Sequence, residues 1–316
     1  MSEDDGMEEL ITEEMLWDRI PEVEGEERAS TYYELSARIY ARGQYDEALA
    51  LAETARDIYS QLGASVSSEG LAQAYSAIGY NLNQLKRMDE AATAMSKAVE
   101  ILRENKSPIA LELACTLGEW WYSSKKYDKV VETMNECAQE HLVDGNEIGA
   151  ANDLHLIGCA ERELKNYEKA IEAFKEARSL FKRNKEVIHV ARCDQKMASC
   201  LIELGEGELA LETARKAVDV FETGHDHRRE TFASFEFGKA QILLEKYDEG
   251  LATLENVLAI VSEDEPKDFE FILDIESRIA KILRMQGRAD EADEIERRLK
   301  SVQEALEDEP ERDLLT

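Results

Sequence analysis

Several features that are common in other protein classes are scarce in this sequence of 316 residues. It contains only four prolines, at positions 21, 108, 266 and 310, so long helices can run uninterrupted between them. No segment shows the strict polar–apolar alternation of a half-buried strand. No stretch approaches the roughly eighteen consecutive apolar residues of a membrane-spanning helix. These absences predict an all-α protein that does not enter a membrane.

Cysteines are few and do not form pairs. The sequence has five, an odd number, and none stands in a Cys-X-X-Cys arrangement. We interpret them as small buried side chains of a protein in a reducing compartment. The N-terminal residues are acidic and lack an apolar core, so we expect no secretion signal. Together these features predict a cytoplasmic location.

Basic residues are outnumbered by acidic ones. The sequence has 38 Lys and Arg against 69 Asp and Glu, which gives a formal net charge of −31 at pH 7. Such a balance opposes direct contact with nucleic acids or anionic membranes through their phosphate groups. It leaves a solvated acidic surface or a basic protein partner. It also allows an acidic mimic of nucleic acid that blocks a DNA-binding partner.

Motifs of catalysis are missing as well. The sequence has no glycine-rich phosphate loop, no nucleophile elbow and no His-Glu-X-X-His. Its one suggestive cluster, His225, Asp226 and His227, supplies at most part of a metal site, because a metal needs three or four converging ligands. We therefore expect no enzyme activity, no cofactor and no metal.

The strongest positive signal is a recurring heptapeptide. Residues 43–49 (GQYDEAL) return as residues 165–171 (KNYEKAI), and weaker copies occur elsewhere. The central positions of the seven copies are Tyr45, Met88, Tyr127, Tyr167, Gly207, Tyr247 and Ala289. A fixed period of about forty residues indicates stacked structural repeats.

Three further positions recur with this period. An acidic residue follows every centre, where a second helix would begin and its free N–H groups and dipole favour a carboxylate. Small residues recur nine positions before the centre, at Ser36, Gly79, Gly118, Gly158, Ala198, Gly238 and Ala280. Others recur three positions after it, at Ala48, Ala91, Val130, Ala170, Ala210, Gly250 and Ala292, with valine as the one larger exception. Small residues at these places let two helices pass closely.

This helix–turn–helix unit resembles the tetratricopeptide repeat, with Gly158, Tyr167, Ala170 and Ala177 in its best copy. The resemblance implies a right-handed α-solenoid of about seven repeats over residues 29–301. We expect an acidic segment at 1–28 whose amphipathic helix, at 7–20, caps the array, and a charged tail at 302–316. Gly207 and Ala289 depart from the aromatic turn position of the family.

The resemblance also implies that the first helices of the repeats line a concave groove that holds ligands. Candidate partner-binding residues there are Tyr33, Tyr40, Tyr80, Asn83, Tyr122, Asn152, His155, Arg162, Arg192, Lys196 and Lys239. The first half of this set is aromatic, and the second half is basic. Arg192 and Lys196 stand one helical turn apart and can reach one carboxylate or phosphate. They resemble half of a carboxylate clamp, but Cys115 and Glu119 occupy the positions of the other half.

We therefore expect a non-enzymatic protein–protein interaction module that binds a peptide or a partner segment in this groove. One alternative is a peptide-sensing regulator of the bacterial quorum-sensing type that acts on another protein. The nucleic-acid mimic is the other. Poorly capped array ends would allow homodimers. Whether the N-terminal helix caps the array or fills the groove is left open.

Overall fold

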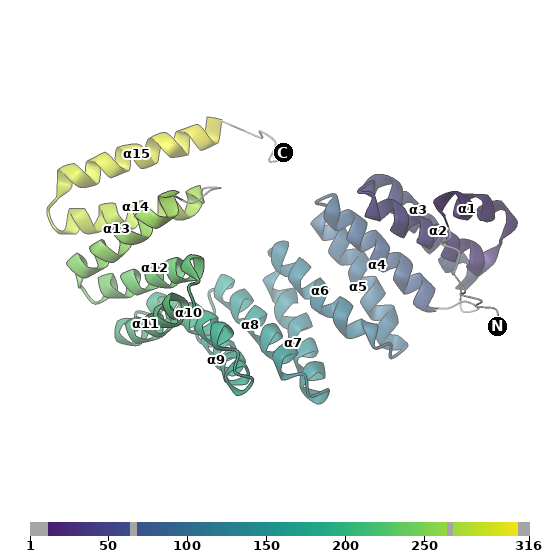
Figure 1. Cartoon of the computed structure of the whole chain (residues 1–316), viewed down its shortest axis with the longest axis horizontal. Helices are drawn as coiled ribbons and strands as arrows, with labels where there is room; N and C mark the ends of the chain where they lie inside the picture. Colours follow the sequence, from purple (N-terminus) through teal and green to yellow (C-terminus); the bar gives the residue numbers. More distant parts are fainter. Residues whose placement is uncertain (1–11, 64–67, 264–267, 309–316) are drawn as a thin grey trace, which may run out of the picture. The chain divides into compact units, whose positions relative to one another are not determined.

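The computed structural model describes residues 12–63, 68–263 and 268–308, and it is helical nearly throughout (Figure 1). The described residues contain no strand. The start of the helix expected at 7–20 and the end of the charged tail fall outside them. The helices are α1 (Glu13–Arg19), η1 (Ile20–Glu22), α2 (Gly25–Ala41), α3 (Tyr45–Leu62), α4 (Ser68–Gln84), α5 (Met88–Glu104), α6 (Ile109–Ser123), α7 (Tyr127–Val143), α8 (Glu147–Glu163), α9 (Tyr167–Arg183), α10 (Val187–Glu203), α11 (Gly207–Thr223), α12 (His227–Leu243), α13 (Tyr247–Glu263), α14 (Phe269–Met285) and α15 (Ala289–Asp308).

From α2 onwards the helices form seven pairs, from α2 with α3 to α14 with α15. The second helix of every pair begins at the residue that the sequence marks as the centre of its repeat. The all-α prediction and the α-solenoid of seven repeats are thus confirmed. None of the described helices combines the length and the apolar character that a bilayer crossing requires.

A left-handed residue closes each first helix. Gly43, Gly205 and Gly287 have φ near +77 to +79°, and lysine or glutamate stands at the other four turns with φ between +57 and +62°. In the fourth pair, Lys165 has φ +62° and the next amide, Asn166 N, donates 2.8 Å back to Glu161 O. This bond satisfies a carbonyl at the helix end and sets the chain to start α9.

The recurring small residues bring the two helices of a pair together, as expected. A Cβ added to Gly158 would lie 2.6 Å from Phe174 Cε1, and one on Gly118 would lie 2.0 Å from Met134 Sδ. Ser36 adds a bond of its own, since its Oγ donates 2.7 Å to Ala48 O on the facing helix. A larger side chain at these positions would separate the helices.

The described part of the N-terminal helix caps the first pair. Leu16 of α1 is fully buried against Leu35 and Ile39 of α2. Thr12 closes the start of α1 with a capping box, and Arg42 pairs with Glu13 at 2.7 Å. The apolar end of α2 is thereby covered, as terminal repeats of an array require.

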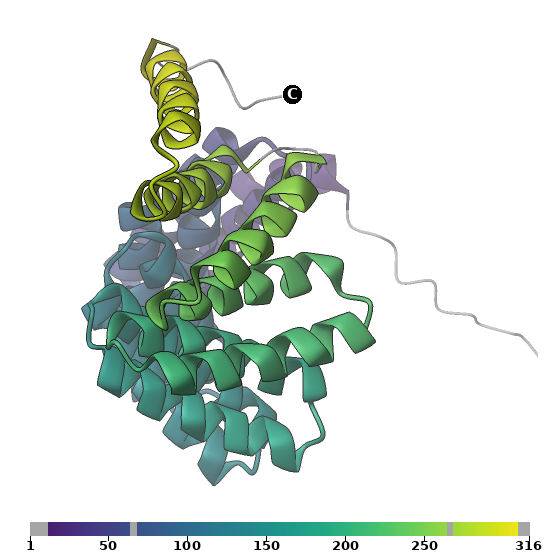
Figure 2. The ribbon, with the colours of Figure 1, turned by 90° about the vertical axis from the view of Figure 1, so that its left-hand side faces the viewer.

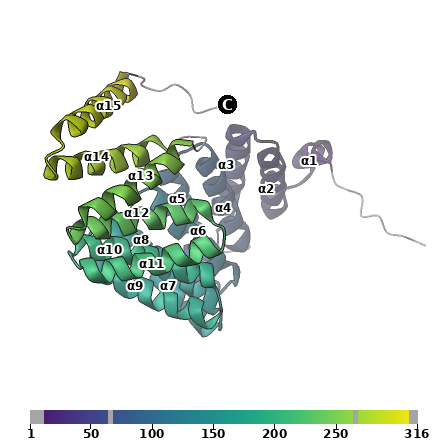
Figure 3. The same cartoon turned by 60° about the vertical axis from the view of Figure 1, so that its left-hand side comes forward.

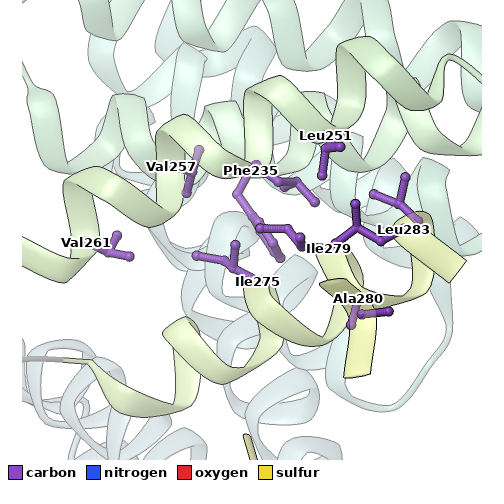
Figure 4. Packing of buried hydrophobic residues seen from close by; sticks show 11 residues of the cluster. Phe235, Leu251, Val257, Val261, Ile275, Ile279, Ala280 and Leu283 are labelled. Atoms are coloured by element: carbon purple, nitrogen blue, oxygen red, sulfur yellow. The ribbon is translucent and has the colours of Figure 1, made fainter. Parts of the chain in front are cut away.

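The chain divides into two compact units that the sequence did not predict. Unit 1 comprises residues 1–146 with α1 to α7, and unit 2 comprises residues 147–316 with α8 to α15. Within unit 2 the pairs stack in order (Figures 2 and 3). Its last pairs share a core in which Phe235 of α12 meets Leu251 and Val257 of α13 and Ile275 and Ile279 of α14 (Figure 4). The boundaries predicted at 28/29 and 301/302 stay predictions.

Candidate functional site

All eleven predicted partner-binding residues lie on first helices of the pairs, namely α2, α4, α6, α8, α10 and α12. Within unit 1, α2 packs against α4, and within unit 2, α10 packs against both α8 and α12. Successive first helices therefore form one layer in each unit, which we call the first-helix layer. The two layers are described separately.

In unit 1 the predicted tyrosines take part in internal packing. The Tyr40 ring lies 5.3 Å from that of Tyr45, and its hydroxyl accepts a 3.1 Å bond from Gln84 Nε2. The Tyr122 ring lies 5.4 Å from that of Tyr127 in the same way. In both cases a first-helix tyrosine packs on the tyrosine that opens the second helix. These contacts explain the aromatic pairs within the repeat itself.

The other residues of unit 1 are also only partly accessible. Tyr80 is 36% exposed and packs edge-on against Trp120, with 5.5 Å between the ring centres. Burial raises the pKa of Tyr80 above its usual range. Tyr33 packs against Tyr59 in a small core cluster, and Asn83 is half-buried. Unit 1 thus offers ring edges and few unpartnered polar groups.

Unit 2 instead gathers positive charge. Burial lowers the pKa of His155 of α8, and the charges of Arg192 and Lys196 from α10 and of Arg162 from α8 lower it further. Arg162 pairs with Glu163 at 2.5 Å. Within the described part of the chain, Arg192 and Lys196 have no ion pair or hydrogen bond from their side chains. Burial and the charge of Arg162 lower the pKa of Lys196. We call Arg162, Arg192, Lys196 and His155 the cationic cluster.

His155 is half-buried on α8. Its ring meets that of Phe174 in α9 edge-on at 5.4 Å, and its Nδ1 lies 3.9 Å from Cys159 Sγ. Its Nε2 is buried and has no hydrogen-bond partner among the described residues. Burial, followed by the charges of Arg192 and Lys196, lowers its pKa to about 3, so the ring is neutral at pH 7.

Lys239 was predicted for the same face, and it is the most buried of the eleven residues. It is 8% exposed, pairs with Glu236 at 2.9 Å and lies 5.1 Å from the centre of the Phe235 ring. Its charge is therefore already compensated on α12. Asn152, by contrast, is exposed near the start of α8.

An aromatic group beside Lys239 was missed by the sequence reasoning. Phe232 and Phe235 of α12 meet Phe271 of α14, with ring centres 4.8 and 5.0 Å apart. Arg278 of α14 lies 5.5 Å from the centre of the Phe235 ring. The repeat period could have indicated two of these residues. Phe232 stands at the same position of its repeat as Arg192 does in the preceding repeat, and Arg278 stands at the position that corresponds to Lys196.

The cluster of His225, Asp226 and His227 lies at the turn before α12 and at its start. His225 and His227 are both exposed, with ring centres 6.5 Å apart. Asp226 between them caps α12 by accepting from Arg229 N at 3.2 Å, and it also pairs with the Arg229 side chain. The carboxylate of this cluster thus serves the start of a helix.

Comparison with known proteins agrees with this architecture. The family model of the tetratricopeptide repeat matches residues 72–105 and 154–182, which fall in the second and fourth helix pairs. No curated protein sequence gives a significant match. The chain thus has an α-solenoid fold, and two of its helix pairs match the tetratricopeptide repeat.

Solved structures with this fold have low sequence identity to the chain. It is similar to a signal-transduction ATPase with a tetratricopeptide repeat sensor from Pyrococcus horikoshii, with a TM-score of 0.65, 18% identity and 93% of this chain covered. It spans 45% of that protein's length. It is also similar to apo RapI, with a TM-score of 0.57, 15% identity and coverage of 89% and 99% of the two chains. A third similar structure is BtubC from P. vanneervenii, with a TM-score of 0.59 and 17% identity. The match covers 72% of this chain and 97% of BtubC. These likenesses concern the fold.

Proposed function

We propose that the chain is a non-enzymatic protein-interaction module, and that the first-helix layer of unit 2 binds an acidic segment of a protein or peptide. The observation that carries this proposal is that no residue in the described part of the chain forms an ion pair with Arg192 or Lys196. In a protein of net charge −31, acidic groups are abundant, and most cations near this layer are paired. Two neighbouring cations without a partner favour an external anion.

The geometry of α10 supports binding of one acidic group by both side chains. Arg192 and Lys196 are four residues apart, so they lie on one face of the helix. Both are half-buried, which strengthens their attraction for an anion relative to exposed cations. Weak contacts at Asn152 and at the aromatic group of α12 would add to this attraction, since a peptide binds through several pockets at once.

The test is affinity capture from a native lysate with the full chain and two double variants. Arg192→Glu with Lys196→Glu should lose the partner. Lys169→Glu with Lys175→Glu changes the charge equally at two exposed positions of α9 and should keep it. Retention of every captured protein by the first variant would reject the proposal, provided its circular dichroism matches that of the wild type.

A peptide-sensing regulator that acts on another protein is the second candidate. What favours it is the likeness to RapI over 99% of that chain. In this case a bound peptide should change the shape of the protein as well as bind to it. Small-angle scattering with and without the captured segment tests this, and an unchanged radius of gyration would count against it. A cytoplasmic location and homodimers through the array ends stay predictions.

A further inference from the structure

The cationic cluster has a buried donor at its base. Burial raises the pKa of the Cys159 thiol, so this thiol stays protonated and can donate to His155 Nδ1, 3.9 Å away. With Nδ1 as acceptor, the neutral ring carries its proton on Nε2. That N–H is buried without a hydrogen-bond partner among the described residues. A buried donor in this state is unfavourable by an amount comparable to a lost hydrogen bond.

The charges around His155 are unbalanced as well. Besides Arg162, Arg192 and Lys196, the second histidine of α10, His189, also acts on it. The acidic residues that act most strongly on Cys159 and Lys196 already have partners. Glu163 pairs with Arg162, and Glu236 pairs with Lys239. Burial, and after it the charge of Arg162, lower the pKa of Lys196.

We propose that His155 Nε2, Arg192 and Lys196 form an oxyanion pocket in unit 2, which takes a carboxylate or phosphate group of the bound partner. This inference rests on the proposed function and assigns a specific role to His155. One anionic oxygen would accept from Nε2 while the two cations compensate its charge. The unpartnered donor and the excess of positive charge would both be satisfied by the same ligand.

A consequence follows for the protonation of His155. The groups that face it are Cys159 and Arg162 on its own helix and His189, Arg192 and Lys196 on α10, while α9 contributes the uncharged Phe174. None of these is an acid. An oxyanion beside the ring would oppose the charges of Arg192 and Lys196, and it would raise the pKa of His155.

The experiment uses the full chain with two probes, a hexaglutamate peptide and inorganic phosphate. Histidine side-chain ¹⁵N resonances are followed during titration at low salt, and affinities are measured by calorimetry. We expect the Nε2 resonance of His155 to move as the probe saturates the protein. Binding of the peptide alone assigns a carboxylate source, and binding of phosphate alone assigns a phosphate source.

Two histidine variants complete the test. His155→Phe keeps a ring against Phe174 and removes the donor, so the affinity should fall about tenfold, as loss of a hydrogen bond to a charged group predicts. His227→Phe, at an exposed position in the same unit, should bind like the wild type.

The inference is overturned if neither probe moves the His155 resonance, a readout that needs no variant. It is also overturned if a folded His155→Phe binds like the wild type. When that variant binds normally but Arg192→Glu with Lys196→Glu does not, the inference fails and the proposed function stands. When both sets of variants retain the natural partner, the proposed function fails.

Discussion

The two units use the same repeat position in different ways. In unit 1, Tyr40 and Tyr122 pack against Tyr45 and Tyr127, at 5.3 and 5.4 Å between ring centres. In unit 2, the equivalent position of the fourth pair holds Arg162, five residues before Tyr167. Aromatic side chains can complete their interactions within the repeat, whereas an arginine needs an acidic partner. The difference places a charged side chain, paired with Glu163, where unit 1 has an aromatic contact within the repeat.

The same contrast exists within unit 2 between two lysines. Lys239 is buried, paired with Glu236 and placed over Phe235. Lys196 is half-buried among other cations, and its pKa is lowered. Sequence alone treats the two lysines alike, but the structure predicts opposite effects when each is replaced. Five changes sharpen these comparisons, in order of decreasing expected effect.

The largest effect is expected for Phe174→Ala, which removes a fully buried ring in unit 2 beneath His155. Loss of such a ring destabilises by about 3–5 kcal/mol. If the two compact units unfold separately, calorimetry should show two transitions, and only one should move. Met95→Ala in unit 1 is the matched control and should move the other one. An equal shift of both transitions by either variant would show that the chain unfolds as one array.

Lys239→Met should have the next largest effect on stability. It leaves Glu236, whose side chain is 13% exposed, as an uncompensated buried charge and removes the cation over Phe235. Breaking a buried pair from one side destabilises by about 3 kcal/mol. Urea denaturation measures the change, with Lys246→Met at an exposed turn as the control. A change below about 0.5 kcal/mol, which is usual for surface positions, would show that the pair contributes little.

The third prediction concerns the pH dependence of stability. An unfolded histidine has a pKa of about 6.5, and native His155 has one of about 3. As the pH falls below 6.5, the unfolded chain binds a proton that the native state does not, so stability decreases by up to about 1.4 kcal/mol per pH unit. Between pH 7 and pH 5 the wild type should therefore lose about 2 kcal/mol more than His155→Phe.

Denaturation midpoints of the two proteins at both pH values measure this difference. Other titrating groups are common to both proteins and cancel in the comparison. Parallel curves for the wild type and His155→Phe would show that His155 takes up protons equally in both states. In that case His155 would not be buried in solution as it is in the structure.

The sequence predicted the architecture far better than the site. Each second helix begins at the predicted centre because an acid and small residues recur there, and both act locally or between the two helices of one pair. Lys239 pairs with Glu236 and lies over Phe235, and Phe235 in turn meets Phe271 and Arg278 of α14, in the next repeat. A position in a repeat does not reveal such partners.

The division after residue 146 was also not predictable. The segment around it, LVDGNEIG, reads like any other turn between repeats, with a glycine of positive φ at Gly145. Its helices have ordinary length and composition. The two units are distinguished by the packing inside each of them, which is a property of the folded chain.

In unit 1, Tyr80→Leu should have a moderate effect on stability alone. It removes the edge-on contact of the Tyr80 ring with Trp120, whose ring centres are 5.5 Å apart, and such an aromatic pair contributes about 1 kcal/mol. Urea denaturation measures the change. Capture of the partner should be unchanged. Loss of capture by Tyr80→Leu would extend the binding surface to unit 1.

The smallest effect, and the most informative in sign, is expected for Lys196→Met. The folded state disfavours the charged lysine, as its lowered pKa indicates, and the described residues offer it no ion pair. Methionine has a similar length and no charge, so the free energy of unfolding should increase by about 1 kcal/mol at pH 7. Binding of the acidic probe should weaken at the same time. A gain in stability together with a loss of binding is typical of a residue kept for its ligand. If Lys196→Met destabilises the protein as Lys239→Met does, then Lys196 has a stabilising partner within the fold. The distinction between the two lysines would then be lost, and with it the main reason to place an anion on α10.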